Sequence, residues 1–251
     1  MPEPDFPVDV GRCIYCGTDR QPLTKEHVVP LGLSGNWHLL RASCPRHSDM
    51  TSAFEGKVLR GGLLNPRVVM GLRTRHPRQR PKSLPVKLKL GWGHSVLTLE
   101  PSNHPGYFAL PVFEPPGTAP LSGETPGIRV RELAIAHIRT RSADLRRQVD
   151  ALRVSVPFPD LLAFSRMIAK IAYAFAVGCF GLDAMLASPV LAAIKGDDAM
   201  VGQWVGCLDD PPVNDASGVH AVTLVPAGQS LRAHVRILAW LRTPEYVVVL
   251  K

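Results

Sequence analysis

The stretch 13–60, CIYCGTDRQPLTKEHVVPLGLSGNWHLLRASCPRHSDMTSAFEGKVLR, decides how the N-terminal part of this 251-residue chain folds. It contains a Cys-x-x-Cys pair, Cys13 and Cys16, and further along a Cys-x-x-His pair, Cys44 and His47. Three thiolates and one imidazole form a tetrahedral set for Zn²⁺ with no open position. We therefore predict a structural zinc ion that holds the fold and takes no part in chemistry.

The segment between the two pairs predicts two strands. Residues 23–30, LTKEHVVP, form a short strand that ends at its proline, and a loop leads to a second strand near 37–40. A helix is expected to begin near residue 50, with Ser48 or Asp49 as its N-cap, or with a capping box one turn later. The local prediction is strand, strand and helix, pinned by zinc.

These motifs resemble the HNH endonucleases, the ββα-metal nucleases. The resemblance is to the branch that carries a zinc-binding Cys-x-x-Cys before a strand of the form acidic-His-Ile/Val-Ile/Val-Pro. The matching residues, in order, are Cys13, Cys16, Glu26, His27, Pro30, Gly35, Cys44 and His47. The match covers residues 13–60, about a fifth of the chain.

The resemblance implies a metal-dependent phosphodiesterase. His27 would be the general base that takes a proton from the attacking water, and an unperturbed imidazole titrates near pH ~6.5. Glu26 would hold or orient a divalent cation, Mg²⁺ or another metal ion, that neutralises charge on the phosphate. The expected activity is endonuclease cleavage of nucleic acid.

The chain departs from the family at its third motif. Members commonly end the second zinc pair as Cys-x-x-Cys-Asn, and the Asn or a His completes the catalytic metal site. Here His47 replaces the last cysteine and Ser48 stands in the place of the Asn. Asp49 would then supply the missing oxygen ligand, and the family's central Asn corresponds to Asn36 or to His38. The alternative is a degenerate, non-catalytic zinc module that binds nucleic acid.

Charge is concentrated after this stretch. The net charge is +8, but residues 56–99 contain no Asp or Glu. Ten basic residues fall in that interval: Lys57, Arg60, Arg67, Arg73, Arg75, Arg78, Arg80, Lys82, Lys87 and Lys89. Such a surface attracts polyanions, although a solvated linker is the alternative. The residues predicted to contact nucleic acid are Arg60, Arg67, Arg73, Arg75, Arg78, Arg80 and Lys82. Because no aromatic residue interleaves with them, double-stranded DNA is the expected partner.

The remainder predicts an α+β domain of antiparallel strands around one central apolar helix. Strands are expected at 84–90, 95–100, 107–113, 200–207, 220–226, 230–241 and 246–250, and helices at 142–152, 159–179 and 188–195. The full fold prediction is therefore a zinc-stapled ββα-metal module followed by an α+β domain. The boundaries are a disordered lead-in at 1–12, the module at 13–62, a basic arm at 63–83 and the domain at 84–251.

Other features limit the class of protein. Residues 161–186 are apolar but include Arg166, Lys170 and Asp183, so a buried helix is expected instead of a membrane span. The N-terminus lacks the apolar core of a signal peptide, and five unevenly spaced cysteines do not form a disulfide framework, which favours the cytoplasm. The role of 84–251 stays open between target recognition, self-association into a homodimer and regulation.

Overall fold

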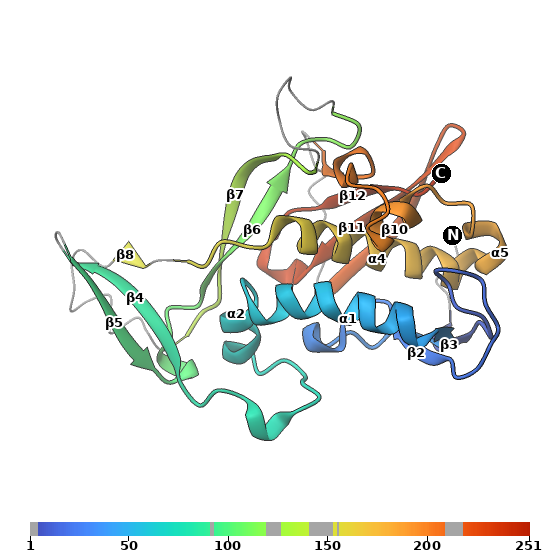
Figure 1. Ribbon diagram of the computed structural model, residues 1–251. Helices are drawn as coiled ribbons and strands as arrows, with labels where there is room; N and C mark the ends of the chain where they lie inside the picture. Colours follow the sequence, from blue (N-terminus) through green and yellow to red (C-terminus); the bar gives the residue numbers. More distant parts are fainter. Residues whose placement is uncertain (1–4, 91–92, 119–126, 141–152, 155, 209–217) are drawn as a thin grey trace.

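The computed structural model describes residues 5–90, 93–118, 127–140, 153–154, 156–208 and 218–251, and a central helix organises them (Figure 1). This helix, α4 (Leu161–Phe180), begins at Asp160, whose side chain accepts a hydrogen bond from the Ala163 amide at 2.9 Å. It is long and apolar enough to cross a membrane, but 78% of its most apolar window is buried inside the protein. The expectation of a buried core helix is confirmed.

The N-terminal part lies along one side of α4. Its sheet has the order β1-β3-β2, formed by β1 (Val8–Asp9), β2 (Thr24–His27) and β3 (His38–Ser43). β2 and β3 are antiparallel, with His27 opposite His38, and β1 is parallel to β3. Helix α1 (Pro45–Arg60) follows β3 directly. The predicted order of strand, strand and helix is therefore present, and its membership of the ββα-metal family stays a prediction.

Two details of this part correct the sequence prediction. α1 begins at Pro45 with Cys44 as its N-cap, so Ser48 and Asp49 lie within the helix and do not cap it. Proline favours the first helical position because its fixed φ suits a helix and its missing N–H has no partner there. The lead-in is also ordered from residue 5: Phe6 stacks on Trp37 with ring centroids 5.7 Å apart, and β1 pairs with β3.

The predicted basic arm folds back against α1 (Figure 1). It contains α2 (Leu64–Val69) and the 3₁₀ turn η2 (Pro77–Gln79). Arg67 ties α2 to the module by donating to the carbonyls of Gly32 (2.6 Å) and Leu59 (2.7 Å). Arg73 donates to the side-chain oxygen of Asn36 at 2.7 Å. The first half of the arm is therefore tied to the module.

The remaining strands form three sheets. A hairpin of β4 (Leu84–Leu90) and β5 (Gly93–Leu99) is joined by β8 (Arg153–Val154), and β6 (Tyr107–Phe113) pairs with β7 (Val130–His137). The third sheet is fully antiparallel, has the order β10-β11-β12-β9 and packs on α4. Its strands are β9 (Val205–Cys207), β10 (His220–Ala227), β11 (Ser230–Ile237) and β12 (Tyr246–Val249). The short helical elements are α5 (Leu182–Met185), α6 (Val190–Lys195), η1 (Leu31–Leu33), η3 (Pro101–Asn103), η4 (Val201–Gln203) and η5 (Ala239–Leu241).

The mixed α+β class with a central apolar helix is confirmed, with local differences. β7 was not predicted, and the strand expected from residue 200 begins only at Val205, after η4. The strand expected at 230–241 ends at Ile237, where η5 follows. α6 has no side-chain cap, and the Ser188 hydroxyl just before it donates to the Leu250 carbonyl at 2.6 Å. The helix expected at 142–152 lies outside the described residues.

The hydrophobic core is continuous across these parts. One cluster of buried side chains extends from Cys13 to Leu250. Within it, the Tyr173 hydroxyl on α4 donates to the Ile14 carbonyl at 2.6 Å. The N-terminal part is thus supported by α4, and the boundary expected near residue 62 stays a prediction.

Candidate functional site

The four predicted zinc ligands come together. The ligand atoms of Cys13, Cys16, Cys44 and His47 all lie within 4.8 Å of one another. The first pair sits in a tight turn closed by Gly17, whose φ of 74° favours glycine, and the second occupies the N-cap and first turn of α1. Burial raises the pKa of the Cys13 thiol to about 12, so its thiolate needs a nearby cation. The donor set fits a structural zinc ion.

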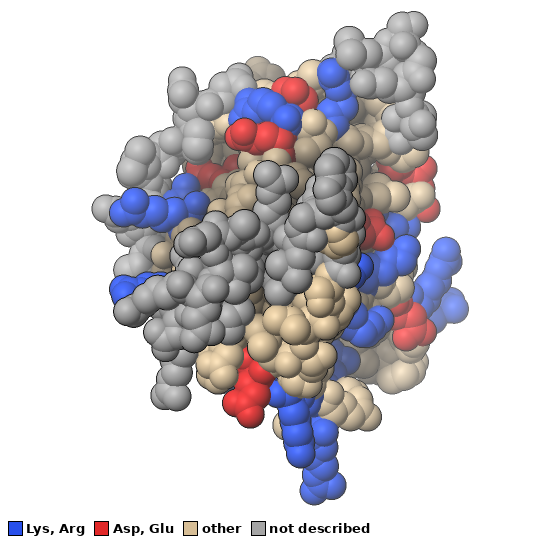
Figure 2. Space-filling model, turned by 90° about the vertical axis from the view of Figure 1, so that its left-hand side faces the viewer, with Lys and Arg blue, Asp and Glu red and all other residues tan. Residues whose placement is uncertain are grey.

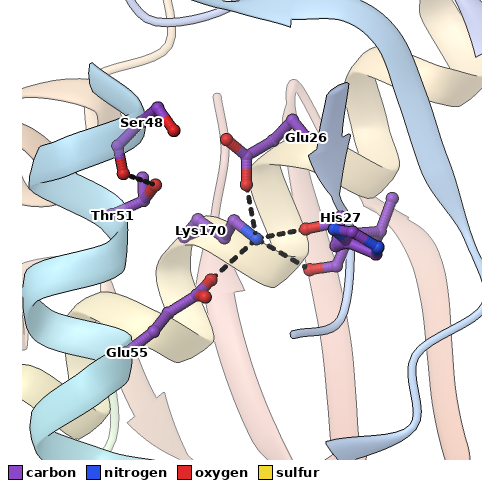
Figure 3. Close-up of polar contacts among 7 residues, drawn as sticks. Glu26, His27, Ser48, Thr51, Glu55 and Lys170 are labelled. Carbon is purple, nitrogen blue, oxygen red and sulfur yellow. Dashed lines mark hydrogen bonds and ion pairs between the residues drawn. The ribbon is translucent and has the colours of Figure 1, made fainter. Parts of the chain in front are cut away.

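A second buried cluster surrounds Lys170 of α4 (Figure 3). Its ammonium nitrogen lies 2.8 Å from Glu26 Oε1 and 2.9 Å from Glu55 Oε1, and it donates to the backbone carbonyls of His27 and Val28. The Lys170 side chain is 0% exposed. Burial acts to lower the pKa of Lys170, but the two carboxylates outweigh burial and raise it, so the lysine is charged. The cluster ties β2, α1 and α4 together.

His27 lies beside this cluster at the end of β2. Its ring centroid is 5.9 Å from that of His38, the residue opposite it in β3. Burial, then the charge of Lys170, lowers the pKa of His27 to about 4. The expectation of an ordinary imidazole near pH ~6.5 is therefore wrong. His27 is uncharged at neutral pH and can accept a proton, although its basicity is reduced.

The residues predicted to hold a catalytic ion do not fit one. Figure 3 shows Ser48, Thr51 and Glu55 along one face of α1, turned toward Glu26 and Lys170. Asp49 is exposed and lies one residue beyond Ser48, so it points away from this face. The Glu26 carboxylate is already bound to Lys170. Among the described residues, the zinc ligands form the one group of three or more metal-type side chains that are close enough to share an ion.

Sequence reasoning missed Lys170 and Glu55 as members of the site. A lysine inside an otherwise apolar helix is a signal, because a buried ammonium requires an anionic partner. Here it served only as an argument against a membrane span. The partner could not be identified, since Glu26 and Glu55 lie far from Lys170 in the sequence.

The predicted nucleic-acid contacts divide into two groups around a cavity of about 530 Å³ between α1 and the arm. Arg60, Arg67, Arg75 and Arg80 line it, whereas Arg73, Arg78 and Lys82 do not. Of the four, Arg67 and Arg80 donate to backbone carbonyls and shape the wall. Arg60 and Arg75 are exposed and have no hydrogen-bond partner within the described ranges. Figure 2, which views the molecule from the left of Figure 1, shows basic side chains projecting at its lower end.

The cavity and the His27 region are electrostatically connected. The Glu55 side chain lines the cavity and binds Lys170, and the charge of Arg75 contributes to the lowered pKa of His27. Chemically, the arrangement offers a proton acceptor that responds to the charge of a cationic pocket. Comparison with known proteins adds no relative, since no family model, curated protein or solved structure matches the chain.

Proposed function

We propose that the protein binds nucleic acid, with DNA as the expected substrate, and hydrolyses its phosphodiester bonds at His27. The observation that carries this proposal is a cavity lined by four arginines, one of which, Arg75, contributes by its charge to the lowered pKa that leaves His27 uncharged. A neutral imidazole can remove a proton from water, and guanidinium groups pair with phosphate oxygens. The resemblance of residues 13–60 to the HNH endonucleases points to the same reaction class.

In the proposed step, a water oxygen attacks the phosphorus while His27 accepts its proton. The bond between phosphorus and the 3′-oxygen breaks, and the leaving oxygen takes a proton from solvent. Arg75 supplies positive charge where negative charge accumulates on the phosphoryl group. Because Glu26 and Asp49 do not fit a catalytic ion, no part of this step depends on one.

His38 is placed to assist. Its Nδ1 lies 3.0 Å from the Asn36 carbonyl, so this nitrogen carries the proton and the remaining ring nitrogen is left as an acceptor. The backbone carbonyl of the neighbouring His27 accepts a hydrogen bond from the Lys170 ammonium group. Both histidines therefore have fixed environments at the same end of the hairpin.

The second candidate function is a non-catalytic module that binds nucleic acid. It is favoured by the contact between Glu26 and Lys170, which occupies the carboxylate that the family resemblance assigns to a metal ion. In this case the zinc-ligand cluster only stabilises the fold, and the arginines provide the binding of nucleic acid. The two candidates make different predictions for substitution of His27.

The test is cleavage of supercoiled plasmid by the wild-type protein, His27→Gln and the matched control His234→Gln. His234 also has a defined polar contact, at 2.8 Å to Glu245, but lies in the C-terminal sheet. We expect His27→Gln to lose roughly 10²–10⁴-fold in cleavage rate, the usual contribution of a general base, and His234→Gln to retain activity. Added Mg²⁺ or Mn²⁺ is compared with no addition, with zinc content checked in each sample.

Equal cleavage by wild type and His27→Gln would exclude His27 as the base. If neither protein cleaves and both bind plasmid with strong salt dependence, the binding module is the correct function. A wild-type protein that neither cleaves nor binds nucleic acid would contradict both.

A further inference from the structure

The arginine-lined cavity has two chemically different sets of lining residues. One is apolar and is formed by leucines and a valine of η1, α1, α2 and the following turn: Leu31, Leu59, Leu64, Val68 and Leu72. The other is cationic and carries Arg60, Arg75 and Arg80 together with His76. Glu55 is the one acidic residue among the described lining residues, and its charge is opposed by Lys170. The cavity therefore suits a ligand that has both an anionic group and an apolar body.

Two glycines keep this space open for the guanidinium groups. A Cβ added at Gly56 would lie 2.4 Å from the Nη2 atom of Arg60, and one added at Gly32 would lie 2.9 Å from Nη2 of Arg67. The same position at Gly32 would meet Leu59 at 2.8 Å. Contacts this short do not occur with a real side chain. The missing side chains let two arginines lie against the walls, and Arg67 is fixed there by two backbone carbonyls.

The volume restricts the class of ligand further. About 530 Å³ lies within the range of small-molecule sites, so the cavity holds one ligand of nucleotide size and not a base-paired duplex. The unpartnered guanidinium groups of Arg60 and Arg75 are available to a phosphate, and the apolar wall is available to a base. This disagrees with the sequence expectation of pure duplex binding, which rested on the lack of aromatic residues. Leucine and valine surfaces provide the apolar wall instead.

We propose that the cavity binds an unpaired nucleotide, with its phosphate on Arg60 and Arg75 and its base against the apolar wall. The inference rests on the proposed function for its choice of nucleic acid, and it names the substrate as a single-stranded or frayed segment, or a free nucleotide. A strand seated in the cavity contacts Arg75, whose charge also acts on His27. Unpaired DNA, not an intact duplex, would then be the form presented for cleavage.

The test measures binding by fluorescence anisotropy in the His27→Gln background, so that cleavage does not interfere. The probes are a short labelled single strand, the same strand with one abasic position, its duplex, and a deoxynucleoside monophosphate as competitor. Arg60→Gln/Arg75→Gln removes the two free cavity cations. Arg78→Gln/Lys82→Gln is the charge-matched control, because both residues are exposed in the arm that carries Arg75 but do not line the cavity.

We expect the cavity double variant to weaken single-strand binding at least about tenfold and the control to weaken it by less than about threefold. The abasic strand should bind more weakly than the intact strand to the parent protein. Competition by the monophosphate at the affinity of the strand would assign the cavity to free nucleotide, and weaker competition would assign it to a strand.

Equal losses in the two double variants, or tighter binding of duplex than of single strand, would overturn the proposal. Because the measurement uses protein without His27, its outcome is separate from the cleavage assay. Cleavage that does not require His27 would end the proposed role of that residue while leaving the cavity assignment intact.

Discussion

Two clusters anchor the N-terminal part of the chain to α1, and they differ in the source of their positive charge. The zinc-ligand cluster fits a cation supplied from solution, and its four ligands all lie between Cys13 and His47. The Lys170 cluster takes its cation from the chain itself, since the ammonium group reaches Glu26 and Glu55 from α4. The first therefore defines a local unit, and the second fixes that unit on the rest of the molecule.

Tyr15 lies between the two clusters. Its ring centroid is 5.5 Å from that of His47 and 6.3 Å from that of Tyr173 on α4. Through Tyr15, the zinc-ligand region therefore packs against α4. Loss of zinc should disturb the hairpin directly, whereas loss of Lys170 should disturb its attachment to α4. Three predictions test this division, in order of decreasing effect.

Zinc removal should have the largest effect. Structural zinc sites contribute apparent binding free energies of about 10–16 kcal/mol, more than the hairpin can replace by packing. We expect Cys16→Ala to lose one zinc per chain, measured by atomic emission, and to lose hydrogen-exchange protection in β2 and β3. Cys179→Ala is the control, because Cys179 lies on α4 outside the ligand set. If the zinc-free Cys16→Ala protein keeps an intact hairpin, the zinc-ligand cluster does not stabilise the N-terminal fold.

The substitution Lys170→Met should have the next largest effect on stability. It leaves two carboxylates buried without a cation, which typically costs about 3–5 kcal/mol in the free energy of unfolding. Urea unfolding measures this, with Lys195→Met as the matched control. Lys195 pairs with Asp197 at 3.0 Å on the surface, where such a pair contributes about 0–1 kcal/mol.

The triple variant Lys170→Met/Glu26→Gln/Glu55→Gln sharpens that result. Because it removes the unpaired charges, it should recover part of the stability lost by Lys170→Met. A triple variant no more stable than Lys170→Met would show that the lysine acts through packing and not through its charge.

The smallest effect on the free energy of unfolding is expected from substitution of His220. This residue joins β10 of the C-terminal sheet to η1 of the N-terminal part. Its Nε2–H donates to the Leu33 carbonyl at 2.7 Å, and its Nδ1 accepts from the Leu238 amide at 3.3 Å. Burial lowers the pKa of His220 in the folded protein. The unfolded chain then binds more protons below its own pKa near ~6.5, so the free energy of unfolding falls as the pH drops through and below that value.

We expect His220→Gln to cost about 1 kcal/mol at pH ~7.5 and to flatten the acid side of the stability profile. Chemical denaturation at a series of pH values measures both quantities. An unchanged slope, with the cost at neutral pH retained, would show that His220 contributes hydrogen bonds but no pH dependence.

The sequence predicts the local features of this protein well. The zinc ligands are close in sequence and follow a known spacing, so Cys13, Cys16, Cys44 and His47 could be identified together. The central helix could be predicted from its continuous apolar residues, and β6 matches its expected bounds at Tyr107–Phe113. In each of these cases the determining contacts lie within a short segment.

The features that were missed depend on residues distant in sequence. Pairing of Lys170 with Glu26 and Glu55 cannot be read from spacing, because it depends on how α4 packs. The lowered pKa of His27 follows from that packing too, and so does the difference between the cavity arginines and Arg78. Asp49 was chosen because it follows Ser48 in the sequence, whereas its exposure on α1 depends on how that helix packs.

The contact between Lys170 and the His27 carbonyl spans 143 positions of the chain, which has a consequence for synthesis. A ribosome adds roughly 5–20 residues per second, so residue 170 is made about 7–30 s after the hairpin. During that interval the hairpin can acquire zinc, but Glu26 and Glu55 have no internal cation and must stay hydrated. We therefore expect the nascent N-terminal unit to exist first in an open form, and its candidate site to be completed only when α4 arrives.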